Sequence, residues 1–139
     1  MDRKDASTNK FTNMDAKALA ASMAKFEGEC ALATVNDDGS PNAALFMPCT
    51  VDESHVVFVL APNRTRENVE RTGLAWAVYV VANPAAEEKA QRHAGARLRL
   101  SLVRNEGETA GEYQAVAEKF PRMNPYVLVF RIEELLPVG

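Results

Sequence analysis

Short apolar segments separated by tight turns dominate the middle of the chain and restrict what it can fold into. Cys30–Val35, Pro41–Val51 and His55–Leu60 are apolar or alternating, whereas Asn36–Ser40 and Asp52–Ser54 between them are rich in turn residues. Connections this short join antiparallel neighbours, so these segments are predicted to form a three-stranded antiparallel meander. The pattern therefore favours a mainly β fold.

Three further segments complete the predicted sheet. Leu74–Val81 is apolar almost throughout, which indicates a strand buried on both faces. Ala96–Val103 alternates leucine with arginine or serine, as a strand with one buried face does. Tyr126–Ile132 is the predicted closing strand. Six strands without an internal repeat or a linker are typical of one small closed sheet.

Helices are predicted at both ends of this sheet. In the segment Phe11–Gly28, Thr12 and Asp15 have the spacing of a capping box, and Gly28 suits the C-terminal cap. Glu112–Phe120 is a second amphipathic segment. Leu19, Met23 and Phe26 form only a narrow apolar stripe on the first helix, so we expect this helix to cover another element rather than to form a core by itself.

Length and charge narrow the class of protein. The chain has 139 residues, of which 47% are hydrophobic, so residues 11–139 are predicted to form a single domain after a flexible leader at 1–10. The net charge of -3 is not that of a nucleic-acid-binding protein. The longest uncharged apolar run, Leu74–Ala82, is too short for a membrane helix, and the charged N-terminus does not resemble a signal peptide. We therefore expect a cytoplasmic protein that binds neither nucleic acid nor membrane.

The reactive side chains predict neither a metal site nor a catalytic residue. Cys30 and Cys49 match no metal or redox spacing, and pairing about the intervening turn would place Cys30 opposite Phe46, so two reduced core thiols are expected. His55 and His93 are interpreted as structural or solvent-facing. The serine and cysteine residues lack a neighbouring base that could activate them for covalent catalysis.

The junction that follows His55–Leu60 is the strongest candidate for a binding site. The strand stops at Pro62 and a helix is predicted over Thr65–Arg71. The first amides of a helix lack backbone partners and carry partial positive charge, and here Arg64 adds a guanidinium and Thr65 a hydroxyl. The residues alone leave two interpretations open, a phosphate site and an ordinary surface turn.

The order of these elements resembles the pyridoxamine 5′-phosphate oxidase-like, FMN-binding split-barrel family, and within it the short FMN-binding proteins. The resemblance spans Phe11–Val138 and rests on Ala31–Val35 followed by Asp38–Pro41, on Asn63–Val69, on Gly95–Leu102 before a helix, and on a final apolar strand. It implies a six-stranded antiparallel split β-barrel with flanking short helices.

The resemblance also implies a cofactor site. It assigns Arg64 and Thr65 to the FMN phosphate, and Asn68 to a secondary anchor that stabilises the loop. The flavin ring would lie against the second and third strands, at Leu45, Phe46, Met47, Pro48, Leu60, Ala61 and Pro62. The segment Leu45–Pro48 offers no polar side chain, and proline has no amide to donate, so flavin contacts there would come from the backbone.

Assembly and activity follow from the same resemblance. Family members are homodimers with the flavin at the subunit interface, which implies that Arg122 and Met123, or Leu136–Val138, cover the ring of the other subunit. The implied function is a flavoprotein with a redox role, either a flavin-dependent oxidoreductase or an electron carrier, with a small-molecule or protein redox partner. The chain ends in Glu133–Gly139 without a basic C-terminal segment, so pyridoxamine phosphate oxidation is not implied.

The apolar character of Leu45–Pro48 keeps an alternative open. A protein of the same fold could be a non-catalytic binding or sensor module that uses haem, a deazaflavin or no ligand. The absorption spectrum of the purified protein would distinguish these cases.

Overall fold

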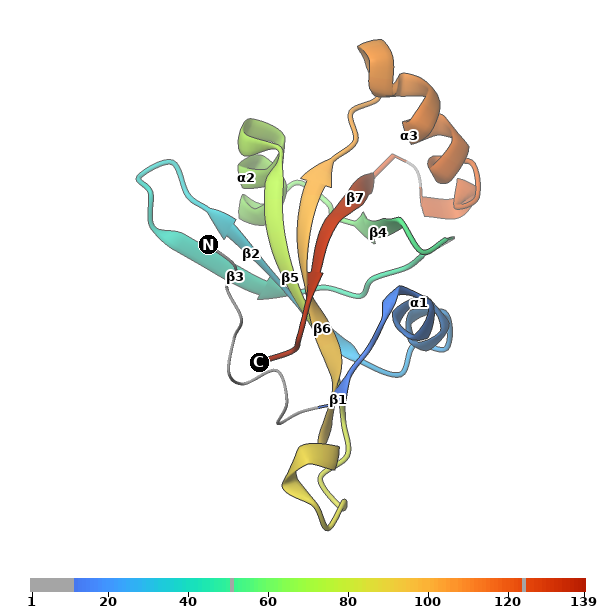
Figure 1. The fold of residues 1–139 in the computed structure, drawn as a ribbon. Coiled ribbons are helices and arrows are strands. Elements are labelled where there is room, and N and C mark those ends of the chain that lie inside the picture. The colour runs from blue at the N-terminus through green and yellow to red at the C-terminus, as the bar shows by residue number, and fades with distance from the viewer. Residues whose placement is uncertain (1–11, 51, 124) are drawn as a thin grey trace.

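The computed structural model describes residues 12–50, 52–123 and 125–139 and confirms the mainly β fold (Figure 1). The strands are Thr12–Asn13 (β1), Glu29–Val35 (β2), Pro41–Leu45 (β3), His55–Val59 (β4), Leu74–Ala82 (β5), His93–Leu102 (β6) and Val127–Leu136 (β7). The helices are Ala16–Ala24 (α1), Arg64–Thr72 (α2) and Ala110–Ala117 (α3), with 3-10 turns at Lys89–Gln91, Gly107–Thr109 and Pro121–Met123. The predicted leader at 1–10 lies outside the described residues.

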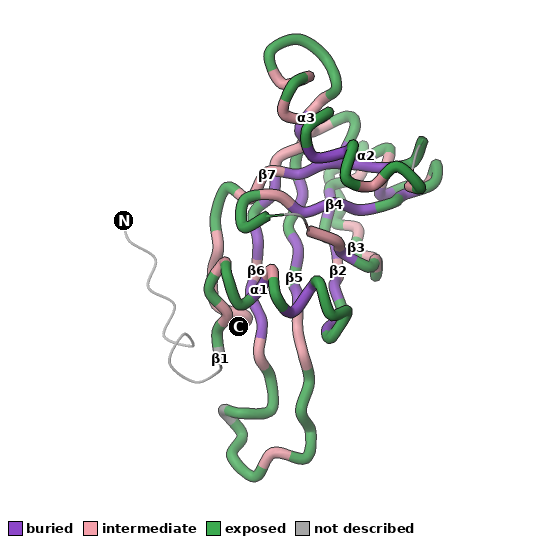
Figure 2. Tube along the Cα trace, turned by 90° about the vertical axis from the view of Figure 1, so that its right-hand side faces the viewer, coloured by how far each residue is buried: buried purple, intermediate pink, exposed green. Residues whose placement is uncertain are grey.

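Six strands follow one another in the order β3-β2-β5-β6-β7-β4, and every neighbouring pair is antiparallel. The sheet curls into a half-barrel, and the short β1 adds a parallel pairing to β6 (Figure 1). This is the predicted split barrel. Burial is concentrated in the strands, whereas the connection between β5 and β6 extends into solvent (Figure 2).

The predicted three-stranded meander is only partly correct. β2 and β3 form the expected hairpin, in which Ala31 pairs with Leu45. β3 ends at Leu45, however, and β4 pairs with β7 at the opposite edge of the sheet, so that a single bridge between Cys49 and Val57 remains of the predicted pairing. Pro48 has no amide hydrogen to donate to a neighbouring strand, and β3 ends three residues before it.

The prediction that β5 is buried on both faces is wrong. Ala75, Ala77 and Tyr79 are buried, but the alternate residues Trp76 and Val78 are 39% and 38% exposed. Their outward surface continues across β2 to β3, since β2 pairs with both β5 and β3. We call this surface the apolar outer face and define it by its exposed members Val35, Leu45, Leu74, Trp76 and Val78.

The inner face of the half-barrel forms the main core, which α1 covers. Leu19 and Met23 of α1 are buried against it, and the hydroxyl groups of Ser22 and Tyr79 are hydrogen-bonded at 2.7 Å. A second, smaller core lies beneath α3, where Val116 and its neighbours pack on β4 and β7. The two flanking helices are thus fixed to the sheet separately.

The predicted capping box at the start of α1 is not formed. The helix begins at Ala16 because Asp15 is its N-cap, and the Asp15 carboxylate accepts a hydrogen bond of 2.8 Å from the Ala18 amide. Thr12 instead belongs to β1. A capping box and a single N-cap residue use the same side-chain types, so the pattern could not separate them.

The end of α1 also differs from prediction. Phe26, not Gly28, adopts the left-handed conformation (φ 54°), with its amide bonded to the Met23 carbonyl and the next amide bonded to that of Ser22. This is the Schellman arrangement with phenylalanine at the usual glycine position. Gly28 serves a different purpose, since a Cβ there would lie 2.5 Å from the Tyr79 ring.

These two positions predict opposite effects on stability. Phe26→Gly should raise the free energy of unfolding by about 1 kcal/mol, because it removes the Cβ strain of a left-handed residue whose side chain is 62% exposed. Gly28→Ala should lower it by about 1 to 3 kcal/mol, because the added methyl group would lie 2.7 Å from the Val80 carbonyl oxygen. Urea unfolding measures both variants.

Gly111→Ala is the control, since an added Cβ there meets nothing within 4 Å. It should be neutral or slightly stabilising within a helix. A destabilised Phe26→Gly variant would contradict the strain argument.

Candidate functional site

The strand-to-helix junction forms as predicted, with the helix one residue earlier. Asn63 is the N-cap of α2, and its side chain accepts a hydrogen bond of 2.8 Å from the Arg66 amide. Gly73 ends the helix in the left-handed conformation (φ 72°). Leu60, before the turn, is 1% exposed and belongs to the main core, whereas Ala61 and Pro62 are exposed. The predicted ring contact at Leu60 is therefore a core side chain in the protomer.

Arg64 is the first residue of α2, and its side chain is exposed. Among the described residues, its guanidinium has no hydrogen bond or ion pair. The α2 amides at positions 64 and 65 precede the first intrahelical hydrogen bond, so they too can receive an anion. The start of α2 therefore presents a cation and two amide donors to solvent.

The surroundings of Arg64 are acidic. The depression beside it has a volume of about 270 Å³ and is lined by Asn36, Asp37, Asp38, Arg64, Glu67, Asn68 and Arg71. Arg71 forms an ion pair of 3.1 Å with Asp37. Hydrogen bonds from Ser40, with a smaller effect of Arg64, lower the pKa of Asp38, so its carboxylate is ionised. Three carboxylates facing two guanidinium groups oppose the binding of a phosphate.

Thr65 and Asn68 face the protein interior. Both are 3% exposed. Asn42 donates hydrogen bonds of 3.2 Å to the hydroxyl oxygens of Thr34 and Thr65, and Asn68 donates to Thr34 at 3.1 Å and to the side-chain oxygen of Asn36 at 2.9 Å. This buried polar network fastens α2 to the β2–β3 hairpin. Asn68 thus ties α2 to the turn between β2 and β3, and its implied part in the cofactor site stays a prediction.

Sequence reasoning missed Thr34 and Asn42. They are partners across the β2–β3 ladder. The sequence did contain a signal for them: Thr34 and Asn42 are polar residues at inward-facing positions of the two strands that flank the predicted hairpin turn. Buried polar groups require hydrogen-bonding partners, so a polar pair on the inner face indicates that a polar element packs there.

Three of the predicted ring contacts line a separate pocket at the other end of the hairpin. Its volume is about 200 Å³, and it is lined by Gly28, Glu29, Cys30, Leu45, Phe46 and Met47. Pro48 is buried next to them. Burial raises the pKa of Cys30 to about 12, so this residue contributes a neutral thiol to the wall.

The two ends of the predicted site are connected along β3. Asn42, which contacts Thr65, is three residues from Leu45, a separation of roughly 10 Å along a strand. A ligand that reaches both ends would therefore run along β3. The remaining predicted contact, Arg122, is exposed on the 3-10 turn before β7 and forms no hydrogen bond or ion pair with the described residues. Met123 packs instead against the smaller core.

A charge network at the other side of the sheet also escaped the sequence analysis. His55 Nδ1 lies 3.0 Å from Asp52, and His55 Nε2 lies 2.7 Å from Glu112 on α3. Glu112 is also paired with Arg131 on β7, whose Nε donates at 3.1 Å. Because each ring nitrogen faces a carboxylate oxygen, both must carry a proton, and His55 is an imidazolium here. Its carboxylate partner on α3 is 57 residues distant, beyond any local pattern.

The network shifts the pKa values of its members. Burial alone would lower the pKa of His55, but hydrogen bonds to Glu112 and Asp52 outweigh it and raise that pKa. Hydrogen bonds from Arg131 and His55 lower the pKa of Glu112 to about 2. The imidazolium thus fastens α3 to β4.

This geometry predicts how stability depends on pH. A raised folded-state pKa means that the stabilisation by His55 is complete below the unfolded pKa of about 6.5 and is lost as the pH rises through the folded value. The contribution of Glu112 is complete above its unfolded pKa of about 4.5 and is lost as the pH falls toward the folded value of about 2. His55→Gln should therefore lower Tm by about 3 to 5 °C near pH 5.5 and by less at pH 9.

Thermal unfolding followed by circular dichroism measures the difference at both pH values. Ala18→Ser, at an exposed position of α1 without a titratable group, is the control and should show no such trend. A wild-type advantage over His55→Gln that stays constant from pH 5.5 to pH 9 would exclude the imidazolium.

The described ranges contain no group of three or more histidine, cysteine, aspartate or glutamate side chains placed to hold a metal ion. Within the same ranges, α1, α2 and α3 all lack the length and apolar character needed to cross a bilayer.

Comparisons with known proteins identify the fold. No protein-family model and no curated protein matches the sequence. Among solved structures, an FMN-binding protein from Syntrophomonas wolfei subsp. wolfei superimposes with a TM-score of 0.57 at 20% identity, covering 90% of this chain and 84% of the other. A candidate pyridoxamine 5′-phosphate oxidase from Lactobacillus delbrueckii gives a TM-score of 0.58 at 23% identity, covering 96% and 99%.

A haem-binding protein from Mycobacterium smegmatis is also similar, with a TM-score of 0.57 at 18% identity. It covers 86% of this chain, which corresponds to 51% of the larger protein. The chain thus has the split-barrel fold of FMN-binding and pyridoxamine 5′-phosphate oxidase-like proteins. Proteins of this fold differ in their ligands, so the fold alone does not select one.

Proposed function

We propose that the chain is a cytoplasmic, homodimeric flavoprotein that binds FMN noncovalently and acts as a flavin-dependent oxidoreductase or electron carrier. The observation that carries this proposal is the exposed Arg64 guanidinium at the start of α2, without an ion-pair partner among the described residues. The next residue, Thr65, contacts Asn42, which is three residues along β3 from Leu45 of the apolar pocket. A protein of the same fold binds FMN, which supports the choice of ligand.

In this proposal each part of the site has a separate task. Arg64 and the first amides of α2 receive the phosphate, and the apolar pocket receives the flavin ring. Thr65 and Asn68 act indirectly, because their buried hydrogen bonds hold α2 in place on the hairpin. When bound, the flavin supplies the redox chemistry, and the chain contributes position and electrostatics.

FMN affinity should respond to the charges around Arg64. Arg64→Gln should weaken FMN binding by about tenfold or more, the effect of one charge-assisted hydrogen bond. Asp38→Asn should instead strengthen FMN binding several-fold, since it removes a carboxylate that interacts electrostatically with Arg64 and would repel the phosphate. Quenching of flavin fluorescence on titration measures both.

Lys17→Gln, on the exposed side of α1, is the matched control. Arg66→Gln serves a different comparison: this guanidinium is held by Glu70 and by the carbonyls of Leu60 and Tyr126, so its loss should reduce stability more than FMN affinity. Equal FMN affinities for wild type and Arg64→Gln would sink the phosphate assignment.

A second candidate is a binding or sensor module of the same fold with another ligand or none. The carboxylates around Arg64 favour it, because they oppose a phosphate but not a ligand that lacks one. Haem is one such ligand class, since a protein of this fold binds it. Oxidised-flavin absorption of the purified protein supports the first candidate, and a Soret band supports the second.

The apolar outer face supports the proposed homodimer. Leu45 is 70% exposed, Leu74 57% and Val35 50%, and they lie on adjoining strands of one surface. Contiguous apolar surface of this kind marks a protein interface, and the commonest partner is a second copy related by a two-fold axis. The same face adjoins the apolar pocket through Leu45, so dimerisation would close the ring site, with Arg122 or the C-terminal residues contributed by the second subunit.

Trp76→Glu should therefore produce a monomer, because it replaces the largest side chain of this face with a carboxylate, and the cross-strand neighbour Arg99 is already paired with Glu134 at 3.0 Å. Size-exclusion chromatography with light scattering measures the mass. Lys17→Glu, on α1, should leave it unchanged. A wild-type protein that is already monomeric, or a dimeric Trp76→Glu variant, would exclude this interface.

A further inference from the structure

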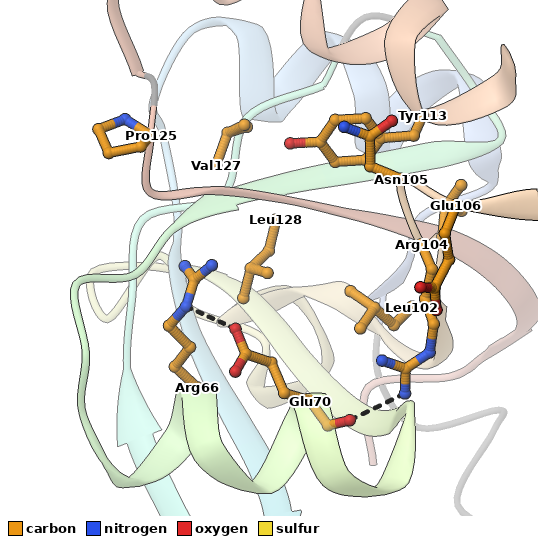
Figure 3. Close-up of a pocket in the computed structure, with 11 residues that line it drawn as sticks. Arg66, Glu70, Leu102, Arg104, Asn105, Glu106, Tyr113, Pro125, Val127 and Leu128 are labelled. Atoms are coloured by element: carbon orange, nitrogen blue, oxygen red, sulfur yellow. Dashed lines mark hydrogen bonds and ion pairs between the residues drawn. The ribbon is translucent and has the colours of Figure 1, made fainter. Parts of the chain in front are cut away.

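A second pocket lies between α2 and α3, above the ends of β6 and β7 (Figure 3). Its volume is about 320 Å³, within the range of small-molecule sites. Leu102, Val127 and Leu128 form its apolar floor, and the Tyr113 side chain of α3 forms a wall. These residues come from elements far apart in sequence, so the pocket is a product of the fold.

The pocket offers hydrogen-bond donors that the described residues leave uncommitted. Arg104 donates one bond of 2.9 Å to the Glu70 carbonyl oxygen and has no ion pair within the described part of the chain. The Tyr113 hydroxyl is directed into the pocket and has no hydrogen-bonding partner there (Figure 3). A guanidinium at one end of an apolar floor, with a phenol at the other end, suits a flat ligand that carries a negative charge at one end.

The acidic residues of the pocket do not cancel this preference. The Glu70 carboxylate is bound by the Arg66 side chain, whose Nε donates at 2.8 Å. Glu106 is exposed. Arg104 is thus the charge in this pocket that a ligand can still neutralise.

The walls of the pocket are fixed before any ligand binds. Arg66 also donates to the Leu60 carbonyl at 2.7 Å and to the Tyr126 carbonyl at 3.2 Å. The opposite wall is carried by α3, which the His55–Glu112–Arg131 network fastens to β4 and β7. Preorganised walls reduce the entropy lost on binding.

We propose that the pocket between α2 and α3 is a second ligand site, which binds a small organic anion with a planar apolar body, an aromatic carboxylate being the simplest member of the class. The carboxylate pairs with Arg104, the ring lies on the leucine and valine floor, and the Tyr113 hydroxyl lies at the opposite end of that floor. This site is independent of the proposed flavin site: Arg66 and Glu70 face it, whereas Arg64, Glu67 and Arg71 face the other depression.

Benzoate is the probe, titrated into the full chain and followed by amide chemical shifts in two-dimensional NMR. We expect saturable shifts confined to residues around Leu102, Tyr113 and Leu128. Arg104→Gln should weaken benzoate binding about tenfold, whereas Tyr113→Phe should have little effect, because the hydroxyl lies at the other end of the floor from the carboxylate. Benzyl alcohol, which keeps the ring but not the charge, should bind more weakly than benzoate.

Arg64→Gln is the matched control, because it removes an exposed arginine from the other side of α2. It should leave benzoate binding unchanged, whereas Arg104→Gln should leave FMN binding unchanged, so the two proposals can fail separately. Circular dichroism confirms that each variant is folded. Three results would overturn the proposal. The first is that no saturable shifts occur up to about 50 mM benzoate, roughly 50 times a millimolar Kd; the second is that the shifts occur elsewhere in the protein; and the third is that wild type and Arg104→Gln bind benzoate equally well.

Discussion

The attachment of α2 to the β2–β3 hairpin is the interaction on which the proposed site depends. Thr34, Asn42, Thr65 and Asn68 join their side chains in a buried network of amide and hydroxyl groups. Loss of one partner would leave a buried polar group unsatisfied, at a cost of about 1 to 3 kcal/mol. Hydrogen bonds have direction, so this network sets the rotation of α2 about its axis. Because of that rotation, Arg64 faces solvent and Arg66 faces the pocket between α2 and α3.

Exposure of apolar surface is the second constraint. The half-barrel has one inner face, which α1 and the core residues fill, and one outer face, which the protomer leaves uncovered over β3, β2 and β5. The same strands carry the apolar pocket at Leu45–Met47. A second subunit would remove both surfaces from water at once. Assembly and ligand binding would then be driven by the same burial of apolar area.

Charge is distributed unevenly between the two sides of α2. On one side, Arg64 is surrounded by carboxylates from the β2–β3 turn and from its own helix. On the other, the carboxylate of Glu70 is neutralised within the chain, and Arg104 keeps its charge for a ligand. One nine-residue helix thus separates a depression with two guanidinium groups and three carboxylates from a pocket with two of each. The difference arises from which neighbours each helix face meets.

Much of the fold could be predicted from local patterns. The β2–β3 hairpin, the junction before α2 and the alternation in β6 are set by turn residues, by a proline and by a period of two, which act within a few positions of the chain. Patterns of this range could not show that β4 pairs with β7, that Gly28 is required by the Tyr79 ring, or that the outer side of β5 stays exposed. Each of these depends on elements far along the chain.

The candidate site divides in the same way. The sequence by itself determined that a basic helix start follows an apolar strand, because capping and helix dipoles are local properties. Only the tertiary structure decided that Thr65 turns inward to Asn42, that carboxylates surround Arg64, and that His55 lies between Asp52 and Glu112. Hydrogen bonds and Coulomb forces act across space between groups that folding brings together. The spacing of residues along the chain therefore does not predict which of these groups meet.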